Sequence, residues 1–186
     1  KEFYVQTNTE YAQEIFTGLL VFDRFTAFFR IFLMLFLVLV VTLTILSGLP
    51  DLEDGPDFYT LLFGSTIGMM IMASSNHLLI LFLGVEMTSV PSYVMVGFLK
   101  GRKISSEAAF KYVVYGAGAA GVMLYGISLL AGLLGTGNMS LMAERLQQVT
   151  STGESIVPGT AIAIMILMVM VGLAFKLSVF PFHFWC

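Results

Sequence analysis

Charged residues are scarce in this sequence: they make up 11% of its 186 residues, whereas hydrophobic residues make up 58%. Soluble domains carry roughly a quarter charged residues, so the composition excludes an ordinary soluble protein. The formal net charge is −3 and the sequence has no basic tract, so nothing in it indicates a nucleic-acid partner. The composition instead indicates that the chain is surrounded by a lipid bilayer.

Cysteine and histidine are also scarce. The one cysteine, Cys186, cannot form an intrachain disulfide. The two histidines, His77 and His183, lie far apart in the sequence, and no cluster resembles a metal, haem or iron–sulfur site. The sequence therefore predicts no cofactor in this chain.

Long apolar runs are abundant. Runs of about 20 apolar residues match the thickness of a bilayer, and they lack the strict alternation of barrel strands. We therefore predict an all-α integral membrane protein. Its five transmembrane helices are expected at about 25–47, 58–75, 78–98, 107–134 and 158–184. We expect a single transmembrane domain over 1–186, and the aromatic end without a polar tail indicates a fragment of a longer, multi-pass chain.

One short polar segment, 100–106, sets the expected orientation. It contains three basic residues, Lys100, Arg102 and Lys103. Because short loops rich in lysine and arginine face the cytoplasm, we expect this segment on the cytoplasmic side of the membrane.

Small residues recur at a spacing that predicts close contacts between helices. GSTIG at 64–68 is one such pattern, and Ala117 with Gly121 is another. Such faces let helix backbones approach each other in lipid, where apolar burial alone does not drive association.

Glu86 is the most informative ionisable residue inside the predicted helices. It lies roughly 12 Å into its helix at the helical rise, too deep to reach the membrane surface. A charge at the bilayer centre costs at least roughly 2.5–3.5 kcal/mol, so such a group usually faces a partner, a cavity or a pathway. Pro91 leaves the Met87 carbonyl without its helical hydrogen bond, which opens this place to water. Glu86 is thus either a proton-exchanging or ion-pairing group, or a neutral residue hydrogen-bonded to a neighbouring helix.

Lys176 marks a second candidate position. It follows a long apolar run and precedes Pro181, so we expect the last helix to break here, as helices of transporters do. Burial disfavours a charged ammonium, so a lysine at such a break can load and release a proton. His183 can extend this relay because an imidazole titrates near neutral pH; alternatively, it is an interfacial residue among aromatic neighbours.

Other charged and polar residues have simpler explanations. Lys111 follows Glu107 by four residues, the spacing of an ordinary helical ion pair. Arg30 is expected to snorkel or pair at the membrane surface, and His77 to lie on the surface in a short loop.

Three motifs resemble those of one known family. They are LFLGVEMTSVPSYVMVGF (81–98), EAAFKY (107–112) and FKLSVFPFHFW (175–185). They resemble the antiporter-like membrane subunits of the proton-pumping NADH:quinone oxidoreductase, respiratory complex I, and most closely its subunit N (subunit 2) type. The resemblance covers about residues 20–186. It implies an inverted-repeat, antiporter-like bundle, of which this chain holds most of the first repeat, ending in the broken helix.

The resemblance also implies roles for individual residues. Glu86 and Lys176 match the acid and the base of the family's proton-loading pair. Lys111 matches a lysine of the family's pathway, which favours a role beyond pairing with Glu107. His183 lies in the family's PFHxW motif. The resemblance therefore implies a proton pathway through Glu86, Lys176, Lys111 and His183.

The family further implies the surroundings of the chain. Its partners would be other membrane subunits of complex I, the lipid bilayer and protons, and its expected location is a bacterial inner membrane. NADH, FMN, iron–sulfur clusters and quinone would bind to the rest of the complex, whose electron transfer drives this translocase. Two alternatives stay open: a subunit of a multisubunit sodium/proton antiporter, and a purely structural membrane subunit whose buried charges lock helix register.

Overall fold

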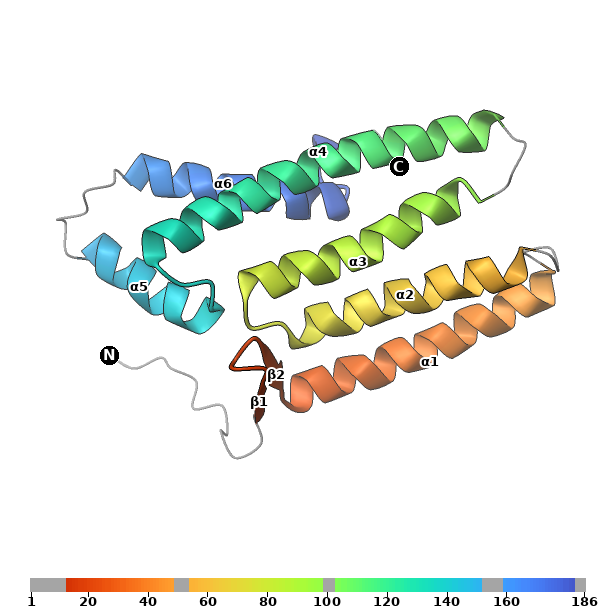
Figure 1. Cartoon of the computed structure of the whole chain (residues 1–186), viewed down its shortest axis with the longest axis horizontal. Helices are drawn as coiled ribbons and strands as arrows, with labels where there is room; N and C mark the ends of the chain where they lie inside the picture. The colour runs from red at the N-terminus through yellow and green to blue at the C-terminus, as the bar shows by residue number, and fades with distance from the viewer. Residues whose placement is uncertain (1–12, 49–53, 99–102, 152–158, 183–186) are drawn as a thin grey trace.

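The computed structural model describes residues 13–48, 54–98, 103–151 and 159–182. Five long helices lie side by side with similar directions (Figure 1). They are α1 (Arg24–Ser47), α2 (Gly55–Ser74), α3 (Leu78–Val96), α4 (Lys103–Leu134) and α6 (Gly159–Lys176). Successive helices pack against each other from α1 to α4, and α6 packs on α4. The predicted all-α membrane bundle is confirmed.

Four of the described helices are long and apolar enough to cross a membrane, namely α1, α3, α4 and α6. The remaining predicted span, 58–75, corresponds to α2, which lies between α1 and α3 in the same bundle. The largest difference from the expected ranges is at the last helix, which ends at Lys176. α4 also begins earlier than expected, at Lys103.

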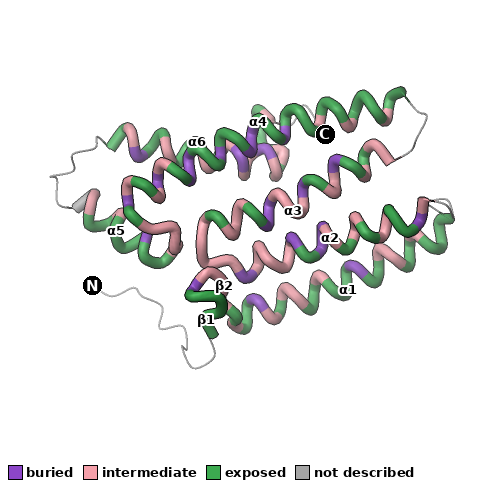
Figure 2. Tube along the Cα trace, in the orientation of Figure 1, coloured by how far each residue is buried: buried purple, intermediate pink, exposed green. Residues whose placement is uncertain are grey.

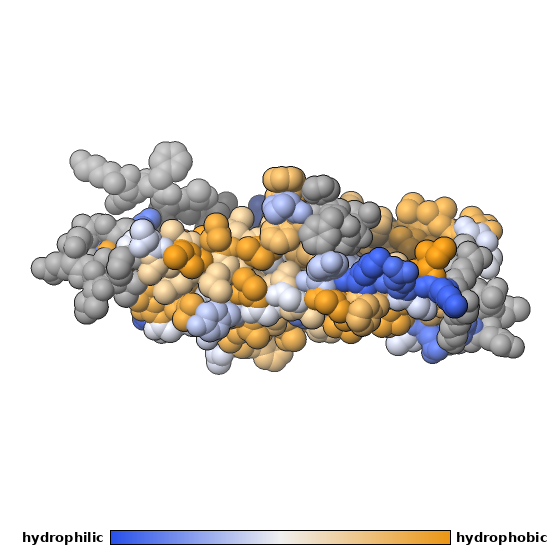
Figure 3. Space-filling view, turned by 90° about the horizontal axis from the view of Figure 1, so that it is seen from above, coloured by the Kyte–Doolittle hydropathy of each residue, from blue (hydrophilic) through white to orange (hydrophobic). Residues whose placement is uncertain are grey.

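The surface of the described chain is mostly apolar. Along the apolar stretch of α1, only 6% of the residues are buried, and exposed positions run along every helix (Figure 2). Seen from above, apolar side chains cover most of the described part of this face, and polar ones gather toward the end where α4 begins (Figure 3). A helix that is apolar on all sides is suited to lipid or to neighbouring transmembrane helices.

Two elements lie at one end of the bundle that the sequence analysis did not predict. A small antiparallel hairpin, β1 (Gln13–Ile15) and β2 (Leu20–Phe22), precedes α1. The short helix α5 (Met139–Ser151) occupies the stretch between the last two predicted transmembrane ranges. It buries Met142 against the end of α4, and its Arg145 side chain donates a hydrogen bond to the Leu134 carbonyl oxygen.

Side-chain and glycine caps explain where helices begin and end. The Thr26 amide donates to Asp23 Oδ1 over 2.7 Å at the start of α1, and Gly48 ends α1 with a φ of 67°. The Leu79 amide donates to His77 Nδ1 over 3.2 Å at the start of α3. His77 is half-buried rather than on the open surface, because its ring lies against Gly137.

The predicted small-residue contacts are half correct. A Cβ built on Gly68 would lie 2.8 Å from the Thr88 amide nitrogen, so α2 and α3 touch through the GSTIG segment. On α4 the predicted pair makes no such contact among the described residues: a Cβ on Gly121 would meet none of them within 4 Å, and Ala117 is exposed. Gly126 makes the contact with α6 instead, because a Cβ there would lie 3.0 Å from the Met165 carbonyl oxygen. The register of the helix decided which small residue faces its partner.

Candidate functional site

Glu86 lies in the middle of α3 and faces α6. Its side chain is 25% exposed, and that of Lys176, the last residue of α6, is 21% exposed. Lys176 Nζ lies 3.9 Å from Glu86 Oε1. This distance is that of an ion pair but is too long for a hydrogen bond. Glu86 Oε1 is buried and has no hydrogen-bond partner among the described residues.

The hydrogen bonds of Lys176 go to two other residues of α3. Its ammonium group donates to Ser89 Oγ and, over 3.1 Å, to Tyr93 Oη. Both acceptors are buried, with relative exposures of 3% for Ser89 and 6% for Tyr93. Since Ser89 Oγ donates its own proton to the Val85 carbonyl oxygen over 2.6 Å, its lone pairs point toward the ammonium.

Sequence reasoning missed Ser89 and Tyr93, although their spacing carried a signal. They follow Glu86 by three and seven residues, which places all three on one face of a helix. A polar face of this kind on an otherwise apolar transmembrane helix indicates a polar partner on another helix.

Aromatic rings enclose the ammonium group. Lys176 Nζ lies 5.3 Å from the centre of the Tyr93 ring and 5.8 Å from that of Phe175. The Tyr112 ring from α4 stands edge-on to Tyr93, with their centres 4.6 Å apart. The negative faces of aromatic rings attract a cation, so the site holds the charged lysine through neutral groups as well as through Glu86.

The helix break beside Lys176 has a local cause. Beyond Lys176 the chain turns: the Val179 amide donates to the Ala174 carbonyl oxygen over 2.9 Å, and Ser178 has a φ of 51°. Pro181 follows and has no amide proton to continue a helix. Lys176 therefore lies at the carbonyl end of α6, where the helix dipole favours a positive charge. The predicted break next to Lys176 is confirmed.

Of the other two predicted site residues, Lys111 does not join this cluster. Lys111 Nζ lies 2.6 Å from Glu107 Oε1 on the outside of α4, where the two side chains are 61% and 65% exposed. His183 lies outside the described residues.

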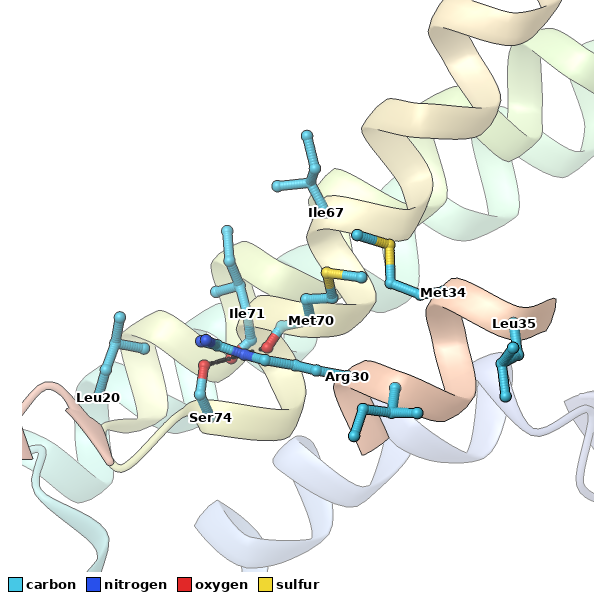
Figure 4. A pocket seen from close by; sticks show the side chains of 9 residues that line it. Leu20, Arg30, Met34, Leu35, Ile67, Met70, Ile71 and Ser74 are labelled. Atoms are coloured by element: carbon cyan, nitrogen blue, oxygen red, sulfur yellow. Dashed lines mark hydrogen bonds between the residues drawn. The ribbon is translucent and has the colours of Figure 1, made fainter. Parts of the chain in front are cut away.

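Arg30 lies in an open groove of about 590 Å³ between α1 and α2. Figure 4 shows its side chain extending from α1 toward the end of α2. Its guanidinium carbon is 5.1 Å from the centre of the Phe22 ring, and its Nε atom is buried without a hydrogen-bond partner among the described residues. The other residues that line the groove are mostly apolar: Leu20, Ile31, Met34, Leu35, Ile67, Met70, Ile71 and Ser74.

The cluster around Lys176 can bind one proton in a membrane interior. It contains a base that is charged when protonated, a carboxylate within Coulomb range and two neutral acceptors. An ammonium in such a site can lose or regain its proton when its neighbours shift, because each neighbour favours the charged form by a different amount. Among the described residues no group of three histidine, cysteine, aspartate or glutamate side chains could hold a metal ion.

The cluster lies within the part of the chain that matches a known protein family. The family described as "NADH:quinone oxidoreductase/Mrp antiporter, TM" matches residues 75–186. NADH-quinone oxidoreductase subunit N 2 of Chloroherpeton thalassium is 37% identical over 175 residues, which cover 92% of this chain and 33% of that protein. Subunit N of a Geobacillus species is 41% identical over 134 residues, 72% of this chain and 26% of the relative.

A solved structure has the same arrangement of helices. A chain of respiratory complex I from Thermus thermophilus with bound aureothin matches with a TM-score of 0.71 and 28% identity. The match covers 94% of this chain and 35% of that chain. The chain thus spans about a third of the length of the relatives that it matches.

Proposed function

Because the chain belongs to the NADH:quinone oxidoreductase/Mrp antiporter transmembrane family, we propose that it forms part of a proton-translocating subunit. The subunit would be of the N type, in a bacterial inner membrane, next to other membrane subunits of NADH:quinone oxidoreductase. NADH, FMN, iron–sulfur clusters and quinone would be bound by the other subunits. Relatives named subunit N support this proposal.

In this proposal Lys176 is the group that loads and releases the proton, and Glu86 tunes it. The main observation that supports this proposal is the distance of 3.9 Å between their charged atoms, which belong to two different helices, beside the break after α6. When Glu86 approaches, the charged lysine is stabilised; when it withdraws, the proton is more easily released. A break in a helix beside a charged group supports such a movement.

Lys111 and His183 are assigned to the ends of the same pathway. Lys111 would exchange protons at the side of the membrane where α4 begins, since its pair with Glu107 is exposed there. His183 would accept the proton beyond the break after Lys176, as the sequence motif suggests.

Neutralising the two central residues tests this function. Glu86→Gln and Lys176→Ala, each in the full-length protein within its assembled complex, should lower the number of protons pumped per NADH oxidised in reconstituted vesicles. Glu144→Gln and Lys103→Ala are matched controls, because both residues are exposed and lie apart from the cluster. Normal pumping by both central variants would overturn the assigned roles.

The family description also includes Mrp antiporters, which supports a sodium/proton antiporter subunit as the second candidate. The same vesicles separate the two functions. A sodium gradient that drives proton movement without NADH would favour the antiporter. Pumping that depends on NADH and is indifferent to sodium would favour the oxidoreductase.

A further inference from the structure

The Tyr93 hydroxyl is held between two helices. On one side it accepts the hydrogen bond from Lys176 Nζ, 3.1 Å away on α6. On the other side the phenol lies directly on the backbone of Gly116 in α4. Both Tyr93 and Gly116 are buried, so the position of the hydroxyl is set by packing rather than by solvent.

Gly116 has no space for a side chain. A Cβ built there would lie 2.6 Å from Tyr93 Cζ and still closer to the hydroxyl oxygen. Real Cβ atoms do not come so near, so any larger residue must displace the phenol. The edge of the Tyr112 ring, with its centre 4.6 Å from that of Tyr93, limits movement in another direction. A methyl group at Gly116 would therefore move the hydroxyl relative to Lys176.

Ser89 and Tyr93 bind the ammonium through hydroxyl groups, which carry no charge. A protonated lysine has three N–H donors, and two of them are directed to these hydroxyl oxygens. Glu86 Oε1, at 3.9 Å, is about 1 Å beyond the length of a charge-assisted hydrogen bond. A small shift of the ammonium along α3 would exchange the hydroxyl pair for the carboxylate.

We propose that Ser89 and Tyr93 form a neutral seat, which holds the Lys176 ammonium apart from Glu86, and that Gly116 positions it. This inference rests on the proposed function of Lys176. Gly116 is a positioning residue that acts through Tyr93. The seat keeps the ion pair open, so that Lys176 alternates between a neutral and an anionic partner during proton transfer.

The test compares three variants of the full-length protein in its assembled complex. Gly116→Ala displaces the Tyr93 hydroxyl, and Tyr93→Phe removes it without adding an atom. Gly118→Ala is the matched control, because a Cβ there would meet none of the described residues within 4 Å. A lost charge-assisted hydrogen bond changes the occupancy of the seat by more than about tenfold. Both seat variants should therefore lower protons pumped per NADH, while the control should equal the wild type.

Two further readouts separate positioning from general damage. The double variant Tyr93→Phe with Gly116→Ala should be no worse than the poorer single variant, because both changes remove the same hydrogen bond.

The pH profile of pumping should also move. Hydroxyl acceptors favour the charged lysine, so without Tyr93 Oη the alkaline loss of pumping should begin at lower pH. The titratable groups that the described chain places around the seat are Glu86, Tyr93, Tyr112 and Lys176.

The outcomes distinguish this inference from the proposed function. If Lys176→Ala pumps normally, the proposed role of Lys176 fails and the seat with it. If Lys176→Ala abolishes pumping while Tyr93→Phe matches the wild type in pumping and pH profile, the seat alone is overturned. If Gly116→Ala only lowers the amount of assembled complex, with normal pumping per complex, its positioning role is overturned. Should Gly116→Ala fail to assemble, Tyr93→Phe and Ser89→Ala decide the matter by the same criteria.

Discussion

Lys176 lies within 3.9 Å of Glu86 but directs its hydrogen bonds to the hydroxyl groups of Ser89 and Tyr93. The two charges are close enough to stabilise each other by Coulomb attraction, yet no direct hydrogen bond fixes them together. An ion pair without a direct hydrogen bond suits a group that must change its protonation state.

Replacing Lys176 with arginine should stop proton transfer while it keeps the positive charge. A guanidinium stays protonated throughout the accessible pH range. We expect Lys176→Arg to reduce proton pumping about as strongly as Lys176→Ala, measured as protons moved per NADH oxidised in vesicles. Pumping near the wild-type level in Lys176→Arg would mean that Lys176 serves by its charge alone.

Removing the cap of α1 should destabilise the start of the bundle. Asp23 Oδ1 accepts the Thr26 amide hydrogen bond, and the loss of such a cap costs about 0.5–2 kcal/mol. Asp23→Ala should lower the melting temperature of the detergent-solubilised full-length protein. Asp23→Asn keeps the acceptor and should restore most of the loss, whereas equal melting temperatures for both variants would argue against a capping role.

Truncating the buried Met123 side chain on α4 is expected to be costly. It is 1% exposed and lies on Gly172 of α6, where a Cβ would come within 2.6 Å of its sulfur. Met123→Ala should cost about 2–5 kcal/mol of unfolding free energy, measured by denaturant titration in detergent. Val122→Ala, at a position 37% exposed, serves as the control and should change little; similar losses in both variants would contradict the assigned packing.

The two glycines of GSTIG should respond differently to substitution. A Cβ on Gly68 would lie 2.8 Å from the Thr88 amide nitrogen, but a Cβ on Gly64 would have Pro91 Cγ at an ordinary 4.0 Å. Gly68→Ala should therefore push α2 from α3 and lower the melting temperature, while Gly64→Ala should be neutral. The reverse order would show that the two helices pack through another face.

Much of the fold was predictable because lipid restricts what a chain can do. In a bilayer every backbone polar group must be satisfied within the chain, so long apolar runs form helices. The five predicted ranges accordingly match helices, with differences mainly at the ends. The hairpin at Gln13–Phe22 and the helix Met139–Ser151 were missed, because segments too short to cross a bilayer carry no such constraint.

The candidate site was predictable in its charged members and not in its neutral ones. Glu86 and Lys176 stand out because a charge in an apolar run is costly. Ser89 and Tyr93 do not, since a neutral hydroxyl group costs less to bury than a charge, and a serine hydroxyl often bonds to its own helix backbone. Gly116 could not be distinguished from Gly118 or Gly121 by sequence, because whether a glycine is required depends on which residue of a neighbouring helix lies against it.

The sequence by itself determined that this chain is a membrane bundle, where its five long helices lie, that Glu86 and Lys176 are the charges to examine and which family its motifs resemble. These properties follow from composition and from short-range patterns along one chain. The tertiary structure decided that Lys176 meets Ser89 and Tyr93 as well as Glu86, and that the Tyr93 hydroxyl lies on Gly116. Those contacts join α3, α4 and α6, and their register depends on how side chains of separate helices fit together.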